Sequence, residues 1–300
     1  MPLQVMLTGA NGFIGRRLAS LLVEQGNDVV GLSRVEADVT DHRALLSQAR
    51  PVDALVHLAF PTRASQRRGA PMEALRAVAS GAGNLVALAV SCGARHLVLA
   101  SSGKVYGEPG ILPTREEHPR NPNTFLGELK VLQESVLELA ARRSDATLGV
   151  TSLRLFNVFG PGQPAEFVIS HLLEGMRRGG PIALGELDHA RDYLYLDDAC
   201  SAFAVALGSP PPLGEFRPLN VGTSRSASVR EILGIFARIS GREPRIVMEP
   251  LRARPEEAAE EIADIGRLRA LGWAPLVTLE DGLRSLWEGG QEGLDNKLAK

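Results

Sequence analysis

The first turn of this chain constrains the fold more than any other segment. An apolar run at residues 4–7 leads directly into TGANGFIG at residues 8–15, and leucines at helical spacing follow until Gly26. This order is typical of a strand, a glycine turn and a helix. In such a unit the first glycine permits the turn and the second lets a pyrophosphate approach the backbone. The third lets helix and strand pack closely.

The start of such a helix attracts anions, because its first N–H groups have no partner within the helix and its dipole is positive there. We therefore predict that this turn binds the pyrophosphate of a dinucleotide. The alternative is a glycine-containing turn of an α/β domain that binds no ligand. The predicted cofactor-binding residues of the turn are Gly9, Asn11, Gly12, Phe13, Ile14 and Gly15.

Strand and helix patterns alternate through the first half of the chain. Apolar strands are predicted at residues 28–33, 38–41, 54–59, 96–101 and 148–156, and long helices at 72–91 and 124–143. Strands that are apolar throughout and separated by helices indicate a parallel sheet covered on both faces. Since crossovers between parallel strands are right-handed, the sheet is doubly wound. We predict an α/β fold of the Rossmann type.

The pattern changes after residue 162. Short strands are predicted at 191–196 and 217–221, among helices at 167–178, 197–207, 229–239 and 278–287. We therefore predict a dinucleotide-binding domain over residues 1–155, with a later contribution from about 192–222, and a smaller α/β substrate-binding domain over 156–300. The tail from Gly289 is expected to fray, as chain ends commonly do.

Composition restricts the class of protein. The 300 residues carry a formal net charge of −2, so the chain has no general attraction for nucleic acid or an anionic membrane. We find no signal-peptide pattern at the start and no apolar run of membrane-spanning length. Cys92 and Cys200 are isolated, which suits a reducing compartment and offers no metal-ligand spacing. We expect a cytoplasmic protein without a metal site.

The end of the second predicted strand bears on the choice of cofactor. An acidic side chain there would accept hydrogen bonds from the adenosine ribose of NAD. This chain has Ser33 and Arg34 instead, and an arginine can pair with the 2′-phosphate of NADP. We therefore expect NADP(H) to be preferred, with NAD(H) possible; a solvated arginine is the alternative. The other predicted contacts with the dinucleotide are Asp38, Val39, Leu58 and Ala59.

Further motifs follow in order along nearly the whole chain. They read ASSGKVYG at 100–107, LGELK at 126–130, RLFNVFGP at 154–161, RDYLYLDD at 191–198, NVGT at 220–223, RP at 254–255 and LGW at 271–273. Together with the glycine turn, these motifs resemble the extended short-chain dehydrogenase/reductase family. The resemblance is strongest to its nucleotide-sugar epimerases, dehydratases and ketoreductases.

The resemblance implies catalytic roles for Ser102, beside the reacting carbonyl, and for Lys130, which holds the nicotinamide ribose. In the family this lysine also lowers the pKa of a catalytic tyrosine. The tyrosine's position holds Leu126 here, which exchanges no proton, and a family asparagine is replaced near Val78. The open alternatives for the missing acid/base are Tyr106, Tyr193 or Tyr195, or a water relay from Ser102 or Lys130.

The substrate class also follows from the resemblance. It implies that Asn157, Arg191 and Arg254 meet the diphosphate of a nucleotide-sugar, with Ser102 near the sugar. The planar fork of arginine suits phosphate oxygens. Surface ion pairs are the alternative for the arginines. His57, inside a buried strand, is predicted to be a core histidine with satisfied hydrogen bonds.

Loss of the tyrosine affects the two directions of redox chemistry differently. Oxidation of an alcohol, the opening step of epimerases and dehydratases, needs a base, whereas reduction of a ketone tolerates its absence better. We predict NADP(H)-dependent reduction of a nucleoside-diphosphate 4-keto-(6-deoxy) sugar. The alternatives are an NAD(P)-dependent nucleotide-sugar epimerase or dehydratase, and a catalytically silent dinucleotide-binding sensor. The resemblance also implies a homodimer, with no nucleic-acid or membrane partner.

Overall fold

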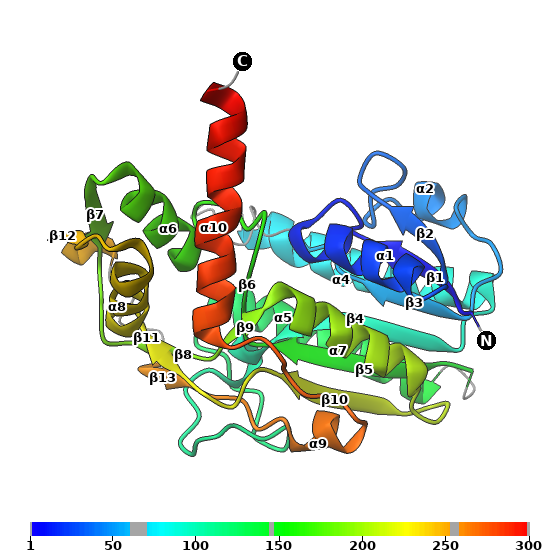
Figure 1. Ribbon diagram of the computed structural model, residues 1–300. Helices are drawn as coiled ribbons and strands as arrows, with labels where there is room; N and C mark the ends of the chain where they lie inside the picture. The colour runs from blue at the N-terminus through cyan, green and yellow to red at the C-terminus, as the bar shows by residue number, and fades with distance from the viewer. Residues whose placement is uncertain (1, 61–70, 144–146, 253–257, 299–300) are drawn as a thin grey trace.

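A six-stranded parallel sheet forms the centre of the molecule. The computed structural model describes residues 2–60, 71–143, 147–252 and 258–298 (Figure 1). The strand order is β10-β5-β4-β3-β1-β2. The strands are β1 (Gln4–Thr8), β2 (Asp28–Leu32), β3 (Ala54–His57), β4 (His96–Ser102), β5 (Gly149–Leu155) and β10 (Phe216–Val221). The strand order reverses between β1 and β3, and ligands of such sheets bind at the carboxyl ends of the strands on either side of this point.

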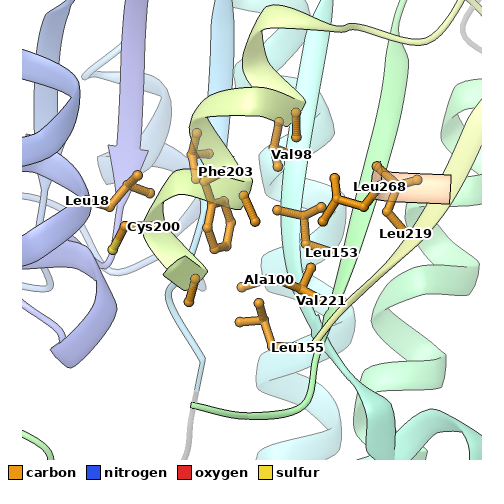
Figure 2. Packing of buried hydrophobic residues seen from close by; sticks show 14 of the residues in the cluster. Leu18, Val98, Ala100, Leu153, Leu155, Cys200, Phe203, Leu219, Val221 and Leu268 are labelled. Carbon is orange, nitrogen blue, oxygen red and sulfur yellow. The ribbon is translucent and has the colours of Figure 1, made fainter. Parts of the chain in front are cut away.

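Successive residues of each strand face opposite sides of the sheet, and both sides are covered. On one side Val98 and Leu153 pack with Leu18 of α1 (Phe13–Glu24) and Phe203 of α7 (Leu196–Gly208) (Figure 2). On the other side the apolar cluster joins strand residues such as Leu97 to three helices. These are α2 (His42–Leu46), α4 (Pro71–Cys92) and α5 (Phe125–Arg143). The predicted doubly wound Rossmann-type sheet is confirmed.

The strand predicted at 38–41 is wrong. Asp38 Oδ1 accepts hydrogen bonds from the backbone N–H and the hydroxyl of Thr40, at 2.9 and 2.8 Å. The Asp41 N–H donates to the Asp38 carbonyl oxygen, which closes a turn. A short acidic side chain competes in this way with a sheet for the backbone. Asn84 of α4 then holds the segment by donating to the Val39 carbonyl oxygen at 3.0 Å.

The C-terminal part contains small sheets and three longer helices. The helices are α6 (Val168–Arg178), α8 (Val229–Ser240) and α10 (Leu279–Leu298), which pack around Phe159, Phe236 and Trp287. The small sheets pair β7 (Pro181–Leu184) with β12 (Arg245–Met248), β6 (Asn157–Phe159) with β9 (Tyr193–Tyr195), and β8 (Ala190–Arg191) with β11 (Ala227–Ser228) and β13 (Glu260–Glu261). Short helical turns occur at η1 (Gly103–Tyr106), η2 (Pro250–Arg252) and α9 (Gly266–Ala270).

Two sequence predictions need correction in this part. The strand expected at 191–196 is divided, because β8 and β9 pair in different sheets on either side of Asp192. The carboxylate of Asp192 turns away to accept hydrogen bonds from Thr223, Ser224 and Ala263. The frayed tail expected from Gly289 is also wrong, since α10 continues to Leu298 (Figure 1). The domain boundaries at residue 155 and about 192–222 stay predictions.

Helix α4 is long and apolar enough to cross a membrane when length and composition alone are considered. Its apolar residues include Ala74, Val78, Leu85 and Leu88, which are buried. Leu85 and Leu88 belong to the apolar cluster beside the sheet, and Val78 packs with Leu129 of α5. The apolar character of α4 therefore belongs to a core helix.

Candidate active site

The glycine turn lies at the carboxyl edge of the sheet, between β1 and α1. Gly9 has φ +75°, a conformation that favours glycine, and its N–H donates to the Leu32 carbonyl oxygen at 2.8 Å. A Cβ on Gly9 would lie 2.7 Å from the Ala59 nitrogen, and one on Gly15 would overlap the Gly9 carbonyl oxygen. The turn thus brings together the ends of β1, β2 and β3.

No side chain caps the start of α1, which follows Gly12. Its first N–H groups therefore have the arrangement that suits a phosphate, and Phe13 and Ile14 contribute two of them. Asn11 lies exposed beside them, and its carbonyl oxygen accepts a hydrogen bond from Arg16 at 2.7 Å. The geometry of the turn therefore fits the pyrophosphate of a dinucleotide.

The end of β2 carries the residues that bear on adenosine recognition. Arg34 is exposed and lies 3.5 Å from the carboxylate of Asp38. Ser33 is buried, and both its N–H, at 2.8 Å, and its hydroxyl donate to the Glu36 carboxylate. These hydrogen bonds lower the pKa of Glu36. Glu36 was not among the predicted residues, although an acidic residue soon after this strand is a visible signal.

Leu58 and Val39 are further predicted contacts with the dinucleotide. The Leu58 N–H donates to the Thr8 carbonyl oxygen at 3.1 Å, so Leu58 and Ala59 continue β3 past its last ladder pair beside the glycine turn. Val39 lies in the turn held by Asn84. The glycine turn and the residues that follow β2 and β3 therefore lie along the same edge of the sheet.

Lys130 is bonded to the carboxyl half of β4, the strand that Ser102 ends. The Lys130 ammonium is buried and donates to the Ala100 carbonyl oxygen at 2.7 Å and to Gln133 Oε1 at 3.2 Å. Burial lowers the pKa of Lys130 from 10.5 to about 7. Ser102 ends the strand and caps η1, its Oγ accepting a hydrogen bond from the Lys104 N–H at 3.2 Å. Leu126, on the first turn of α5, is half-buried.

The three tyrosines of the chain are all packed elsewhere. The hydroxyl of Tyr106 donates to Asn220 Oδ1 at 2.7 Å and accepts from Arg154 at 2.8 Å. Burial raises the pKa of Tyr106 to about 12. Tyr193 and Tyr195 are buried against Phe159 in the C-terminal part. Tyr106 therefore belongs to a buried polar network, and at this pKa its phenol stays protonated near neutral pH, so it does not take a proton from an alcohol.

Glu134 and Arg154 form the centre of that network. Their side chains are 0% and 3% exposed, and the guanidinium and carboxylate meet at 2.8 Å. Ser152 also donates to Glu134 at 2.8 Å. The pair was not predicted, because its residues are twenty positions apart on different elements. Its burial between α5 and the sheet indicates a structural role.

His57 is a core histidine, as predicted. Its Nδ1 and the Thr8 hydroxyl are 2.7 Å apart inside the sheet. Burial, with a smaller contribution from the charge of Lys130, lowers the pKa of His57 to about 3. The imidazole is therefore neutral at physiological pH and serves the packing of β1 against β3.

Two predicted diphosphate residues come together around an acidic residue that was not predicted. Asn157 Nδ2 donates to Glu261 Oε2 at 3.4 Å, and Arg191 Nε lies 3.6 Å from Glu261 Oε1. Lys104 Nζ contacts the same carboxylate at 2.6 Å. We call Lys104, Asn157, Arg191 and Glu261 the charged cluster. The third predicted residue, Arg254, lies outside the described residues.

The sequence predicted two of the four residues of the charged cluster. Asn157 and Arg191 stand in motifs, whereas Lys104 and Glu261 lie 157 positions apart. The lysine within ASSGKVYG is a signal that could have been noticed, since it lies two residues after the predicted Ser102. Within the described part of the chain, no group of three or more His, Cys, Asp or Glu residues has the arrangement of a metal site.

The parallel sheet, the uncapped helix after the glycine turn and the lysine at the end of β4 define a dinucleotide-binding α/β protein. Residues 5–222 match the NAD dependent epimerase/dehydratase family, and the chain belongs to this family.

Similar proteins cover nearly the whole chain. GDP-6-deoxy-D-mannose reductase of Pseudomonas aeruginosa is 30% identical over 314 residues, spanning 96% of this chain and 98% of the relative. A putative UDP-glucose 4-epimerase of Methanocaldococcus jannaschii is 27% identical, over 93% of this chain and 96% of the relative. The structure of MoeE5 with UDP-glucuronic acid and NAD has a TM-score of 0.88 and 28% identity, over 97% and 99% of the two chains.

Proposed function

We propose that this protein is an NADP(H)-dependent reductase of a nucleoside-diphosphate 4-keto sugar, with a 6-deoxy sugar as the preferred class. One observation carries the proposal: Lys130 is bonded to Ala100 of β4, the strand that Ser102 ends, while position 126 is leucine and the three tyrosines are buried. Such a site can orient a ketone for reduction. It lacks the phenol that would take a proton from an alcohol, so reduction is favoured over epimerisation and dehydration.

The cofactor would lie on the glycine turn, with its pyrophosphate at the start of α1. When bound, reduced NADP supplies the hydride. Arg34, exposed at the end of β2, would pair with the 2′-phosphate, since a guanidinium suits phosphate oxygens. Lys130 would donate to the nicotinamide ribose, and the Ser102 hydroxyl would polarise the carbonyl oxygen. Solved relatives bound NAD, so the preference for NADP(H) depends on Arg34.

The diphosphate would lie at Asn157 and Arg191, with Arg254 as the third predicted contact. Both described residues belong to the charged cluster. The likeness to GDP-6-deoxy-D-mannose reductase supports a reductase, and the likeness to MoeE5 supports a nucleotide-sugar ligand. The cytoplasmic location stays a prediction from the composition, and the homodimer stays a prediction from the resemblance.

The first experiment measures NADPH oxidation when the purified protein meets a thymidine-diphosphate 4-keto-6-deoxy sugar, with NADH measured alongside. We expect oxidation of NADPH that Lys130→Ala abolishes and that Arg34→Ala weakens for NADPH but not for NADH. The exposed Arg230, paired with Asp188, offers a matched control, and Arg230→Gln should leave both rates unchanged. If neither cofactor is oxidised while the nucleotide-sugar binds, the reductase proposal is wrong, and an epimerase assay becomes decisive.

A further inference from the structure

Glu261 lies among side chains that are suited to bind an anion. Its Oε1 is 2.6 Å from Lys104 Nζ and 3.6 Å from Arg191 Nε, and its Oε2 accepts a hydrogen bond from Asn157 at 3.4 Å. Ammonium, guanidinium and amide groups are among the side-chain donors that bind phosphate oxygens. These three donors come from η1, β6 and β8. The Glu261 carboxylate therefore presents negatively charged oxygens to them, as a phosphate group would.

Two of the three contacts are longer than well-formed hydrogen bonds. Donor and acceptor of an N–H···O bond are usually about 2.7–3.2 Å apart, whereas the contacts of Asn157 and Arg191 with Glu261 measure 3.4 and 3.6 Å. A carboxylate has two oxygens on one carbon, and of the three donors Lys104 is the one close to it. A diphosphate carries more oxygens over a greater length. The arrangement of the donors thus fits a larger anion better than it fits Glu261.

The charged cluster is largely shielded from water. The side chains of Glu261 and Arg191 are each 9% exposed, and that of Lys104 is 16% exposed. Charges interact strongly at such sites, because little water is present to screen them. A buried cation without a counter-charge is costly, so Glu261 stabilises the two cations while no ligand is bound. The same negative charge repels an incoming diphosphate.

The backbone of Glu261 is held in place on both sides of the site. Glu261 pairs with Arg191 in the short ladder between β13 and β8. Two residues further on, the Ala263 N–H donates to the buried carboxylate of Asp192 at 3.1 Å. The side chain of a glutamate can change rotamer and carry its carboxylate away from the donors while the backbone stays. A displaced carboxylate therefore remains near the bound anion, and its charge continues to oppose binding.

We infer that Glu261 is an internal counter-ion of the diphosphate site, and that a nucleotide-sugar binds by displacing its carboxylate from Lys104, Asn157 and Arg191. The inference rests on the proposed function, which places the diphosphate at Asn157 and Arg191. It adds Lys104 as a further contact of the diphosphate. It also gives Glu261 a defined effect, since the carboxylate lowers the affinity of the site for the diphosphate.

Glu261→Gln tests this role, because it keeps the length of the side chain and an oxygen acceptor while it removes the charge. Calorimetric titration with thymidine diphosphate and with inorganic pyrophosphate measures affinity without any reaction. We expect both Kd values to fall about tenfold or more, since a like charge is removed from the site. Glu260→Gln is the matched control. Glu260 is the exposed neighbour of Glu261 and bonds Ser226, so both Kd values should stay within about twofold of wild type.

The opposite role for Glu261 predicts the opposite change in affinity. A carboxylate that orients Arg191 toward a phosphate would be needed for binding, and Glu261→Gln would then bind both diphosphates more weakly than wild type. That result would overturn the inference. Kd values equal to those of wild type would overturn it as well.

The stability of Glu261→Gln gives a second measurement. The variant leaves two buried cations without this counter-charge, so its Tm should lie below that of wild type. Pyrophosphate should raise the Tm of the variant more than that of wild type, because the anion replaces the missing charge. An equal or smaller rise would overturn the inference.

Glu261→Asp is a second variant that keeps the charge and therefore favours folding. Its carboxylate is drawn back from the donors by one methylene, so it is displaced more easily. Both Kd values should be at least about threefold below those of wild type, since the ion pair that an anion must break is weaker. Unchanged or higher Kd values for this variant would also overturn the inference.

Binding and turnover separate this inference from the proposed function. Proteins that bind both diphosphates as expected but do not oxidise NADPH with a 4-keto sugar would overturn the reductase and support the role of Glu261. If neither wild type nor Glu261→Gln binds thymidine diphosphate or pyrophosphate, the role of Glu261 and the nucleotide-sugar substrate are both wrong.

Discussion

The ammonium of Lys130 lies over the ring of Phe60, 3.8 Å from its centroid. The ring attracts the cation, but it does not replace the water that burial removes. Glu134, one turn further along α5, is engaged by Arg154. Desolvation therefore prevails over the attraction of Glu134 and lowers the pKa of Lys130 to about 7. A lysine in this state is costly to keep charged, which is typical of functional sites.

The first prediction concerns stability against pH. Between about pH 7 and pH 10.5 the unfolded chain holds a proton on Lys130 that the folded chain has lost, so the free energy of unfolding rises with pH. Lys130→Met removes this dependence. Urea denaturation near pH 7 and near pH 9 measures the free energy of unfolding of both proteins. From the lower to the higher pH, that of wild type should rise relative to the variant by up to about 1.4 kcal/mol per pH unit. Parallel stabilities at both pH values would contradict the lowered pKa.

The second prediction compares two glycines inside helices. Gly15→Ala should weaken NADPH binding at least tenfold and lower stability, because the new Cβ would overlap the Gly9 carbonyl oxygen. Gly83 of α4 is exposed and has open space around it. Gly83→Ala should leave binding unchanged and stabilise the protein by roughly 0.5–1 kcal/mol. Fluorescence titration and thermal melting provide the measurements, and equal behaviour of the two variants would count against the close packing.

The third prediction separates structure from catalysis at Tyr106. Tyr106→Phe should lower the free energy of unfolding by about 1–3 kcal/mol, since Asn220 and Arg154 lose a buried partner. Turnover per folded molecule should stay unchanged. Tyr195→Phe is the matched control, because the Tyr195 hydroxyl makes a long 3.4 Å hydrogen bond with Ser285, weaker than the two short bonds of Tyr106. A large loss of kcat in folded Tyr106→Phe would show that the phenol takes part in the reaction.

The fourth prediction concerns acid. Burial lowers the pKa of His57 from 6.5 to about 3. Between these pH values the imidazole is protonated in the unfolded chain but neutral in the folded chain. The free energy of unfolding therefore falls as pH falls through this range. Wild type should lose stability relative to His57→Asn between about pH 7 and pH 5, by up to about 1.4 kcal/mol per pH unit. Denaturant titrations measure it, and a constant difference would refute the shift.

Local sequence patterns predicted most of the strands and helices of the fold. The glycine turn, the apolar strands and the long helices α4 and α5 were predicted close to their observed bounds. The strand predicted at 38–41 was wrong because hydrogen bonds that Thr40 donates to the Asp38 carboxylate prevailed over the apolar signal of Val39. Of the candidate site, the predictions named Ser102, Lys130, Asn157 and Arg191, but neither Lys104 nor Glu261.

The sequence by itself determined the structural features that depend on residues close to one another along the chain. A turn such as that at Gly9 follows from local backbone sterics, and burial of a strand follows from its own side chains. The tertiary structure alone decided that Tyr106 bonds Asn220, and that Lys104 meets Glu261 from 157 positions away. These contacts depend on which segments the sheet brings to one edge, and the strength of a charge there depends on the water that folding removes.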